Sequence, residues 1–232
     1  MIVRPSDELA AAFARLGGEE DGQVWSELWD DLCHQGEVYE DSFLALPYLA
    51  AIATGRAPGA LQDAVLMAGL IASAADDEHG ARYAAEFAVL LPVARHLLDM
   101  ATDDRPTFVY LLQCLLAFEG ERVWSAGRLE GLFYEEYEVD CPRCESTLFI
   151  AFGDHGTFAS AGDYVTADPV KTPLLPADPA ALDPLPARLH RMAMEAGHEG
   201  AARGLTYLFG RAMCPDCAGD FVVSDQVAET YL

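Results

Sequence analysis

Four cysteines in two matched pairs are the residues of this sequence whose types and spacing best suit chemistry. Cys141–Cys144 is Cys-Pro-Arg-Cys and Cys214–Cys217 is Cys-Pro-Asp-Cys, so each pair places two thiols on one short turn. A β-prone run follows each pair, Thr147–Ile150 after the first and Phe221–Val223 after the second. Two such turns can present four sulfurs to one tetrahedral ion. We therefore predict one structural zinc ion per chain, held by Cys141, Cys144, Cys214 and Cys217.

Two other uses of these thiols stay open. Thiol redox chemistry also occurs on Cys-Pro-x-Cys sequences, but it favours a single pair at a strand-to-helix junction, where the helix N-terminus lowers the thiol pKa. Here there are two pairs, and each runs into a predicted strand. Disulfides suit secreted chains, and the N-terminal sequence does not indicate secretion. The 69 residues between Cys144 and Cys214 form a longer gap than compact zinc sites use, so this segment must hold structure of its own.

The remaining candidate ligands are better explained as structure. Cys114 lies in a leucine-rich run, and Cys33 precedes His34, whose side chain would diverge from it by about 100° on a helix. We predict that both cysteines are buried free thiols. The acidic run 76–80 resembles a metal cluster but is typical of a loop between helices. His155 is a further candidate ligand, which a complete four-cysteine set makes unnecessary.

The sequence contains no legible catalytic constellation. GxGxxG, GxxxxGK[ST], HExxH and GxSxG, the fingerprints of common cofactor and hydrolase sites, are absent. Acidic neighbours such as Asp30-Asp31 point to different faces of an element, whereas general acid–base catalysis needs facing carboxylates. An enzyme stays open, but the sequence favours a non-enzyme.

Charge is the strongest compositional signal. In a chain of 232 residues, 38 acidic residues outnumber 14 basic ones, and the formal net charge is −24. Residues 1–139 carry 25 acidic and 8 basic residues, and the remainder carries 13 and 6. Such a field repels phosphate backbones. We therefore predict no direct nucleic-acid binding.

Hydropathy predicts a globular protein that does not enter a membrane. Apolar residues make up 52% of the chain, which is typical of a protein with a substantial core. The N-terminus turns acidic at Asp7 and has no apolar signal segment. The longest uncharged apolar stretch, residues 64–75, is too short to span a bilayer. Together with thiols that look reduced, these features predict a cytoplasmic location.

The first part of the chain has apolar residues at helical spacing and a weak repeat. Leu46–Leu49 is Leu-Pro-Tyr-Leu and Leu91–Ala94 is Leu-Pro-Val-Ala, an offset of 45 residues, and the helix predicted over 37–52 contains the first of these prolines. A period near 45 made of paired helices is typical of HEAT and armadillo arrays. Residues 22–130 therefore resemble a short HEAT-like array, a class that mostly binds other proteins along a concave face. The bias of 13 arginines to one lysine resembles proteins from GC-rich bacterial genomes.

The C-terminal part resembles a zinc ribbon. Strands are predicted over 134–139 and 147–152, on either side of the first cysteine pair, and the second of them begins a hairpin. A last strand over 220–224 is expected to pair with them. The proline-rich segment 167–186 predicts an extended crossover, and a helical insertion is predicted over 187–210.

These observations predict a mainly α fold. A short HEAT-like helical-hairpin array occupies residues 1–133, and a small β/α zinc-ribbon subdomain occupies residues 134–232. The expected function is a cytoplasmic protein-interaction module or scaffold, in its specific form an immunity- or antitoxin-like binder of a basic partner, because opposite charges speed association. The alternatives are an acidic DNA-mimicking regulator and a Cys-Pro-x-Cys redox protein or enzyme. The sequence does not define the oligomeric state.

Overall fold

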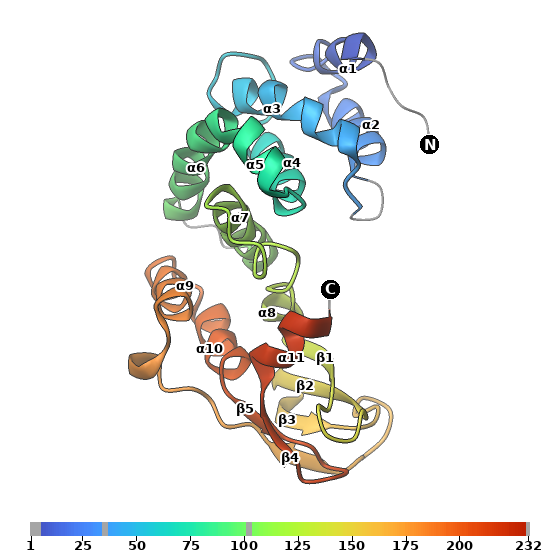
Figure 1. The fold of residues 1–232 in the computed structure, drawn as a ribbon, viewed down its shortest axis with the longest axis vertical. Coiled ribbons are helices and arrows are strands. Elements are labelled where there is room, and N and C mark those ends of the chain that lie inside the picture. The colour runs from blue at the N-terminus through green and yellow to red at the C-terminus, as the bar shows by residue number, and fades with distance from the viewer. Residues whose placement is uncertain (1–5, 34–36, 101–103, 231–232) are drawn as a thin grey trace. The chain divides into compact units, whose positions relative to one another are not determined.

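The chain forms two compact units in a computed structural model that describes residues 6–33, 37–100 and 104–230 (Figure 1). The first unit comprises residues 1–100 and 110–127, and the second comprises residues 101–109 and 128–232. Helices account for about 54% of the chain, so it is helix-rich, with a small antiparallel sheet of four strands. The division into independent domains over 1–133 and 134–232 stays a prediction.

The first unit is built from helices. Its elements are α1 (Ser6–Phe13), α2 (Asp21–Leu32), the 3₁₀ helix η2 (Glu40–Ala45), α3 (Leu46–Ala53), α4 (Leu61–Ser73), α5 (Asp77–Arg82), α6 (Ala84–Asp99) and the larger part of α7 (Arg105–Phe118). Helix α3 packs against α4 and α6, and each of the three helices contributes fully buried residues to the core, among them Leu49, Met67 and Leu90. In the described part of the chain, no helix is both long and apolar enough to cross a membrane.

The two prolines aligned by the 45-residue offset have different structural roles. Pro47 lies in the first turn of α3, where a backbone N–H has no partner within the helix, so its absence costs nothing. The residues before α3 form the separate 3₁₀ helix η2. The prediction of one helix over 37–52 with an internal proline is therefore wrong. Pro92 does lie inside its helix, α6. The two matched sequence segments thus occupy different positions within their helices.

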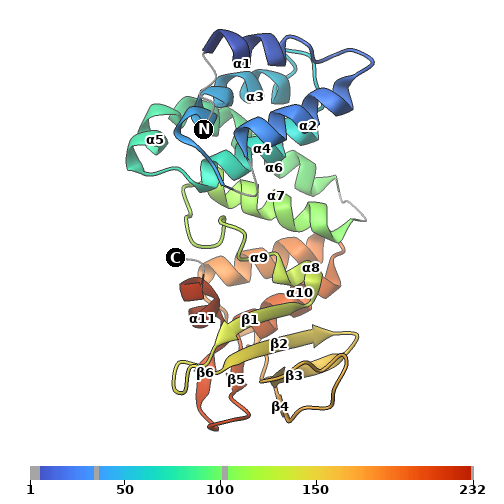
Figure 2. The ribbon, with the colours of Figure 1, turned by 90° about the vertical axis from the view of Figure 1, so that its right-hand side faces the viewer.

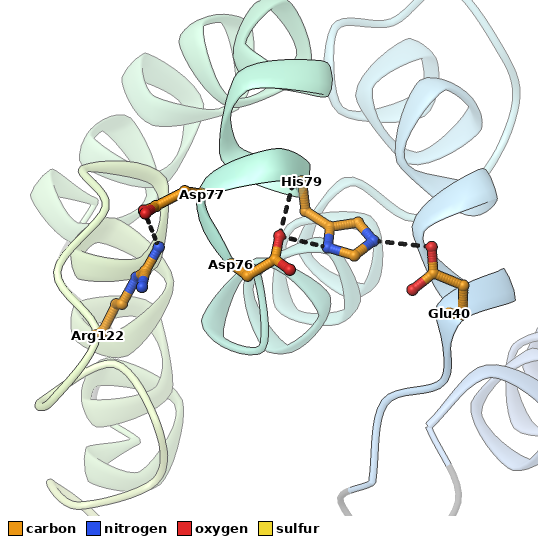
Figure 3. Close-up of polar contacts among 5 residues, drawn as sticks. All are labelled: Glu40, Asp76, Asp77, His79 and Arg122. Atoms are coloured by element: carbon orange, nitrogen blue, oxygen red, sulfur yellow. Dashed lines mark hydrogen bonds and ion pairs between the residues drawn. The ribbon is translucent and has the colours of Figure 1, made fainter.

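The acidic run 76–80 begins a short helix and is not the predicted loop. The Asp76 carboxylate accepts a hydrogen bond from the His79 backbone N–H at 2.8 Å, which is the N-cap arrangement that starts α5. The His79 ring lies between two carboxylates (Figure 3), with Nδ1 2.8 Å from Asp76 Oδ1 and Nε2 3.1 Å from Glu40 Oε1. These contacts fix α5 to η2.

The His79 contacts make the stability of the first unit depend on pH. Burial by itself lowers the pKa of His79, but hydrogen bonds with Asp76 and Glu40 outweigh it and raise the pKa above its ordinary value of 6.5. The protonated ring therefore stabilises the fold at low pH, and this contribution is lost as the pH rises through the folded-state pKa. All three tryptophans lie in the first unit, so their fluorescence follows its unfolding.

We expect the thermal midpoint of the first unit to fall between about pH 6 and about pH 8, the range in which histidine titrates. The fall should be smaller in His79→Gln, which cannot carry the charge. His96→Gln, at an exposed histidine of α6, is the control. An equal pH response in wild type and His79→Gln would contradict the prediction.

The second unit combines helices with two antiparallel sheets (Figure 2). Beyond the first residues of α7, its elements are α8 (Gly131–Tyr134), β1 (Glu136–Asp140), β2 (Thr147–Gly153), β3 (Gly156–Ser160), β4 (Lys171–Pro173), the 3₁₀ helix η3 (Pro179–Ala181), α9 (Pro184–Glu195), α10 (Glu199–Leu208), β5 (Arg211–Met213), β6 (Asp220–Val222) and α11 (Val223–Thr230). Strands β1 to β4 form one sheet in sequence order, and β5 pairs with β6. Helices α8 and α11 pack on β1, and α10 packs on α8, α9 and α11.

Two sequence predictions for this unit need correction. The hairpin after the first cysteine pair is confirmed, because β2 pairs with β3. The last strand, however, is shorter than predicted and pairs with β5 instead of the first sheet, and Ser224 belongs to α11. The proline-rich segment 167–186 is extended only in part. It contributes the edge strand β4 and the 3₁₀ helix η3, and α9 already begins at Pro184, because proline is well tolerated in a first helical turn.

Candidate metal centre

The two cysteine pairs lie on two β-hairpins of the same construction. Strands β1 and β2 enclose the first pair and close with the Asp140–Thr147 pairing. Strands β5 and β6 enclose the second pair and close with the Met213–Asp220 pairing. Both closing pairs span seven positions and are 73 positions apart, so the two turns have equal length and correspond residue by residue.

The backbone of the two turns is also the same. The Cys141 N–H donates to the Ser146 carbonyl at 2.9 Å, and the Cys214 N–H donates to the Gly219 carbonyl at 2.8 Å. The residue after each second cysteine has a left-handed backbone, with φ of 60° at Glu145 and 54° at Ala218. For residues other than glycine this conformation costs roughly 1–2 kcal/mol.

Both turns contain a left-handed residue that carries this energetic cost, and the two residues occupy equivalent positions. In both turns the left-handed residue donates its N–H back to the carbonyl of the first cysteine at 2.9 Å, from Glu145 to Cys141 and from Ala218 to Cys214. The bond closes each turn and brings the second sulfur back toward the first. The arrangement indicates that both turns are shaped to orient their sulfurs.

The structure brings all four predicted cysteines together. Cys141 Sγ lies 3.7 Å from Cys217 Sγ, and Cys144 Sγ lies 3.7 Å from Cys214 Sγ, so each short distance joins one hairpin to the other. All four sulfurs lie within 4.8 Å of one another. Zinc–sulfur bonds of about 2.3 Å put the corners of a tetrahedron about 3.8 Å apart. The sulfurs are therefore spaced to bind one metal ion, and at 3.7 Å they are not joined as disulfides.

Hydrogen-bond donors lie beside the sulfurs of Cys144, Cys214 and Cys217. The Ser146 hydroxyl lies 3.4 Å from Cys144 Sγ, and together with the Ser146 backbone N–H it lowers the pKa of the Cys144 thiol to about 6. Burial raises the pKa of the Cys214 thiol to about 12, although backbone N–H groups of Asp216 and Cys217 act in the other direction. Donors aimed at sulfur favour the thiolate, which is the form of cysteine that binds metals.

Arg143 joins one turn to the other and was not a predicted site residue. Its Nη1 donates to the Cys217 carbonyl at 3.5 Å. Its aliphatic part lies against Gly219, where an added methyl group would come to 3.2 Å from Arg143 Cδ and 3.1 Å from Cys217 Sγ. A cation here would offset part of the negative charge that four thiolates would carry around a divalent ion. The sequence signal for this role is weak, because the second turn has Asp216 at the equivalent position.

The other candidate ligands lie outside this cluster. Cys33 and Cys114 are buried and free as predicted, and burial raises the pKa of both thiols to about 12. His34 lies outside the described residues. His155 lies in the turn between β2 and β3, where its ring meets the edge of the Tyr164 ring at a centroid distance of 5.6 Å. Among the described residues, the four-cysteine group is the cluster that could hold a metal.

Comparisons with protein-family models, with curated proteins and with solved structures found no match to this chain. The fold and the site therefore define its class by themselves. It is a helix-rich protein with four clustered cysteines that could hold a metal ion.

Proposed function

We propose that the four cysteines hold one Zn²⁺ ion per chain and that this ion is structural. Three features support zinc: the sulfur spacing, the four thiolate ligands and the closed shell, which leaves no position for a substrate. Neither cysteine pair is followed directly by a helix, the arrangement that lowers the thiol pKa in redox proteins. The ion joins two hairpins that are far apart in the sequence, as in a zinc ribbon.

We further propose that the chain is a protein-interaction module that binds a basic protein partner. The observation that carries this proposal is the charge of the helical unit: residues 1–100 and 110–127 hold 19 acidic and 6 basic residues, a net charge of −13. No catalytic group is needed for such a role. A partner of opposite charge is attracted over long range and associates rapidly.

Two finer features belong to this proposal. The paired helices α3 and α4, against which α6 packs, are consistent with a short HEAT-like scaffold, although the two proline segments differ in their helices. In its specific form the partner is a basic toxin or nuclease that the chain neutralises in a bacterial cytoplasm, as an immunity protein or antitoxin does. A regulator that mimics DNA would occupy the nucleic-acid site of such a partner.

Affinity capture at two salt concentrations tests the interaction. We expect one dominant, stoichiometric partner with a basic isoelectric point, and we expect the complex to weaken strongly at about 0.5 M salt, where the Debye length is roughly 4 Å. A complex that persists unchanged at this salt would contradict binding by charge. Displacement of duplex DNA from the captured partner separates a DNA mimic from a binder that uses another surface.

A further inference from the structure

The first unit has a groove on its surface with a volume of about 570 Å³. The groove is lined by the end of α4, by α5 and α6, and by the end of α7 with the segment that follows it. Sites for small molecules and side chains typically have volumes of about 300–1,000 Å³. The groove is therefore large enough to receive a side chain of a partner.

The wall of the groove formed by α6 and α7 is apolar. Phe87 and Phe118 stack with ring centroids 6.2 Å apart and form the buried floor beneath this wall, at 8% and 7% exposure. Ala84 and Ala88 of α6 line it too and are exposed, so nothing within the first unit covers this part of the wall. Such a surface suits the aliphatic stem of a long side chain.

The polar part of the lining is acidic. Four carboxylates and one guanidinium line the groove, which gives a net charge of −3, and these residues are Asp76, Asp77, Glu119, Glu121 and Arg122. Asp76, Glu119 and Glu121 already bond to His79, to Arg95 and to backbone N–H groups, whereas the Asp77 side chain is fully exposed. The exposed alanines and Asp77 together are complementary to a side chain with an aliphatic stem and a cationic head.

One guanidinium already lies at this acidic edge. Arg122 Nη2 lies 2.5 Å from Asp77 Oδ1 (Figure 3), and the two side chains are 55% and 100% exposed. Exposed ion pairs of this kind contribute little to stability, so a competing cation can replace Arg122. The contact shows how a guanidinium can meet Asp77, and it also marks Arg122 as a competitor of any cation from outside.

We propose that this groove receives an arginine side chain of the partner, with its stem on Ala84 and Ala88 and its guanidinium on Asp77 in place of Arg122. This rests on the proposed function and names the recognition element of the basic partner. Arginine fits better than lysine, because its planar guanidinium can bind a carboxylate with two parallel hydrogen bonds.

A fluorescein-labelled nona-arginine peptide tests the proposal by anisotropy at low salt. Ala88→Trp fills the groove without changing the charge and is expected to weaken binding by roughly tenfold, as removal of an interface anchor does. Ala85→Trp is the matched control, because Ala85 is an exposed residue of α6 that does not line the groove. It is expected to bind as wild type does.

A second pair of variants gives a gain of binding, which a folding defect would not produce. Arg122→Ala frees Asp77 and is expected to tighten binding by about two- to fivefold, the worth of an exposed ion pair. Arg56→Ala removes the same charge at an exposed position of the first unit outside the groove and is the control. The proposal requires that Arg122→Ala bind the peptide more tightly than Arg56→Ala does.

The outcomes separate the groove from the proposed function. Suppose that wild type binds the peptide, but that Ala88→Trp has the same affinity as Ala85→Trp and Arg122→Ala the same affinity as Arg56→Ala. The groove is then not the site, and the acidic surface still binds a basic partner. If wild type does not bind the peptide at low salt, the proposal that charge attracts the partner fails as well.

Discussion

Replacing Cys214 with serine is expected to remove the metal from the chain and to unfold the second unit. Cys214 is 1% exposed and its Sγ lies 3.7 Å from Cys144 Sγ of the other hairpin. A serine hydroxyl is a much weaker ligand than a thiolate and would also be buried. Structural zinc supplies about 10–16 kcal/mol of binding energy in small zinc-folded peptides. A whole domain is stable by only about 5–15 kcal/mol, so loss of such an ion is expected to outweigh the other contacts of the unit.

Metal content and spectroscopy check this prediction. Wild type is expected to contain one zinc per chain and four thiols protected from a thiol reagent, and Cys214→Ser to contain none and to lose β-sheet signal. Cys33→Ser removes a buried thiol of the first unit and is the control that keeps its metal. Because all three tryptophans lie in the first unit, their fluorescence shows whether that unit stays folded.

Three results would contradict this prediction, and each would point to a different error. A Cys214→Ser protein that retains stoichiometric zinc would show that the metal is held elsewhere. Loss of zinc with the second unit still folded would show that the ion is dispensable for the fold. Wild type without zinc and with four reactive thiols would return the redox alternative to first place.

The cluster of four cysteines was predictable because its signal is local. Two cysteines with two residues between them, followed by β-branched and aromatic residues, indicate a turn between strands without reference to the rest of the chain. The two hairpins even share their spacing, since Asp140 and Met213 occupy equivalent positions. The pairing partner of β6 was not predictable from pattern alone, because β5 has only three residues and follows α10 directly.

The helical unit was predictable in outline and not at its helix ends. Apolar periodicity marks which residues are buried, but it does not tell a proline in a first turn from one inside a helix. Pro47 and Pro92 both follow a leucine and differ in this respect. The start of α5 depends on the Asp76 side chain and on the contact of His79 with Glu40, which is 39 positions earlier in the chain. Such long-range contacts have no sequence pattern.

Replacing Gly69 with alanine is expected to destabilise the first unit, although alanine favours a helix over glycine by about 1 kcal/mol. A methyl group on Gly69, in α4, would clash with the Cys114 sulfur and would come to 2.6 Å from Cys114 Cβ and 2.9 Å from Cys114 Cα. Side-chain rotation moves neither of the last two atoms, so α4 and α7 must move apart at a contact where Cys114 is 4% exposed. Overpacking of this kind costs about 1–3 kcal/mol or more.

Chemical unfolding followed by tryptophan fluorescence measures the change in stability. Two further variants serve as a control and as a test of the clash. Gly22→Ala, in α2, adds the same methyl group where no atom lies within 4 Å and is expected to stabilise the unit slightly. Cys114→Gly in the Gly69→Ala background removes the clashing side chain, and the two changes should show a favourable coupling of about 0.5–3 kcal/mol. If Gly69→Ala were as stable as Gly22→Ala, α4 and α7 would not approach each other this closely in solution. The same result would undermine the groove, because its walls depend on the packing of these helices.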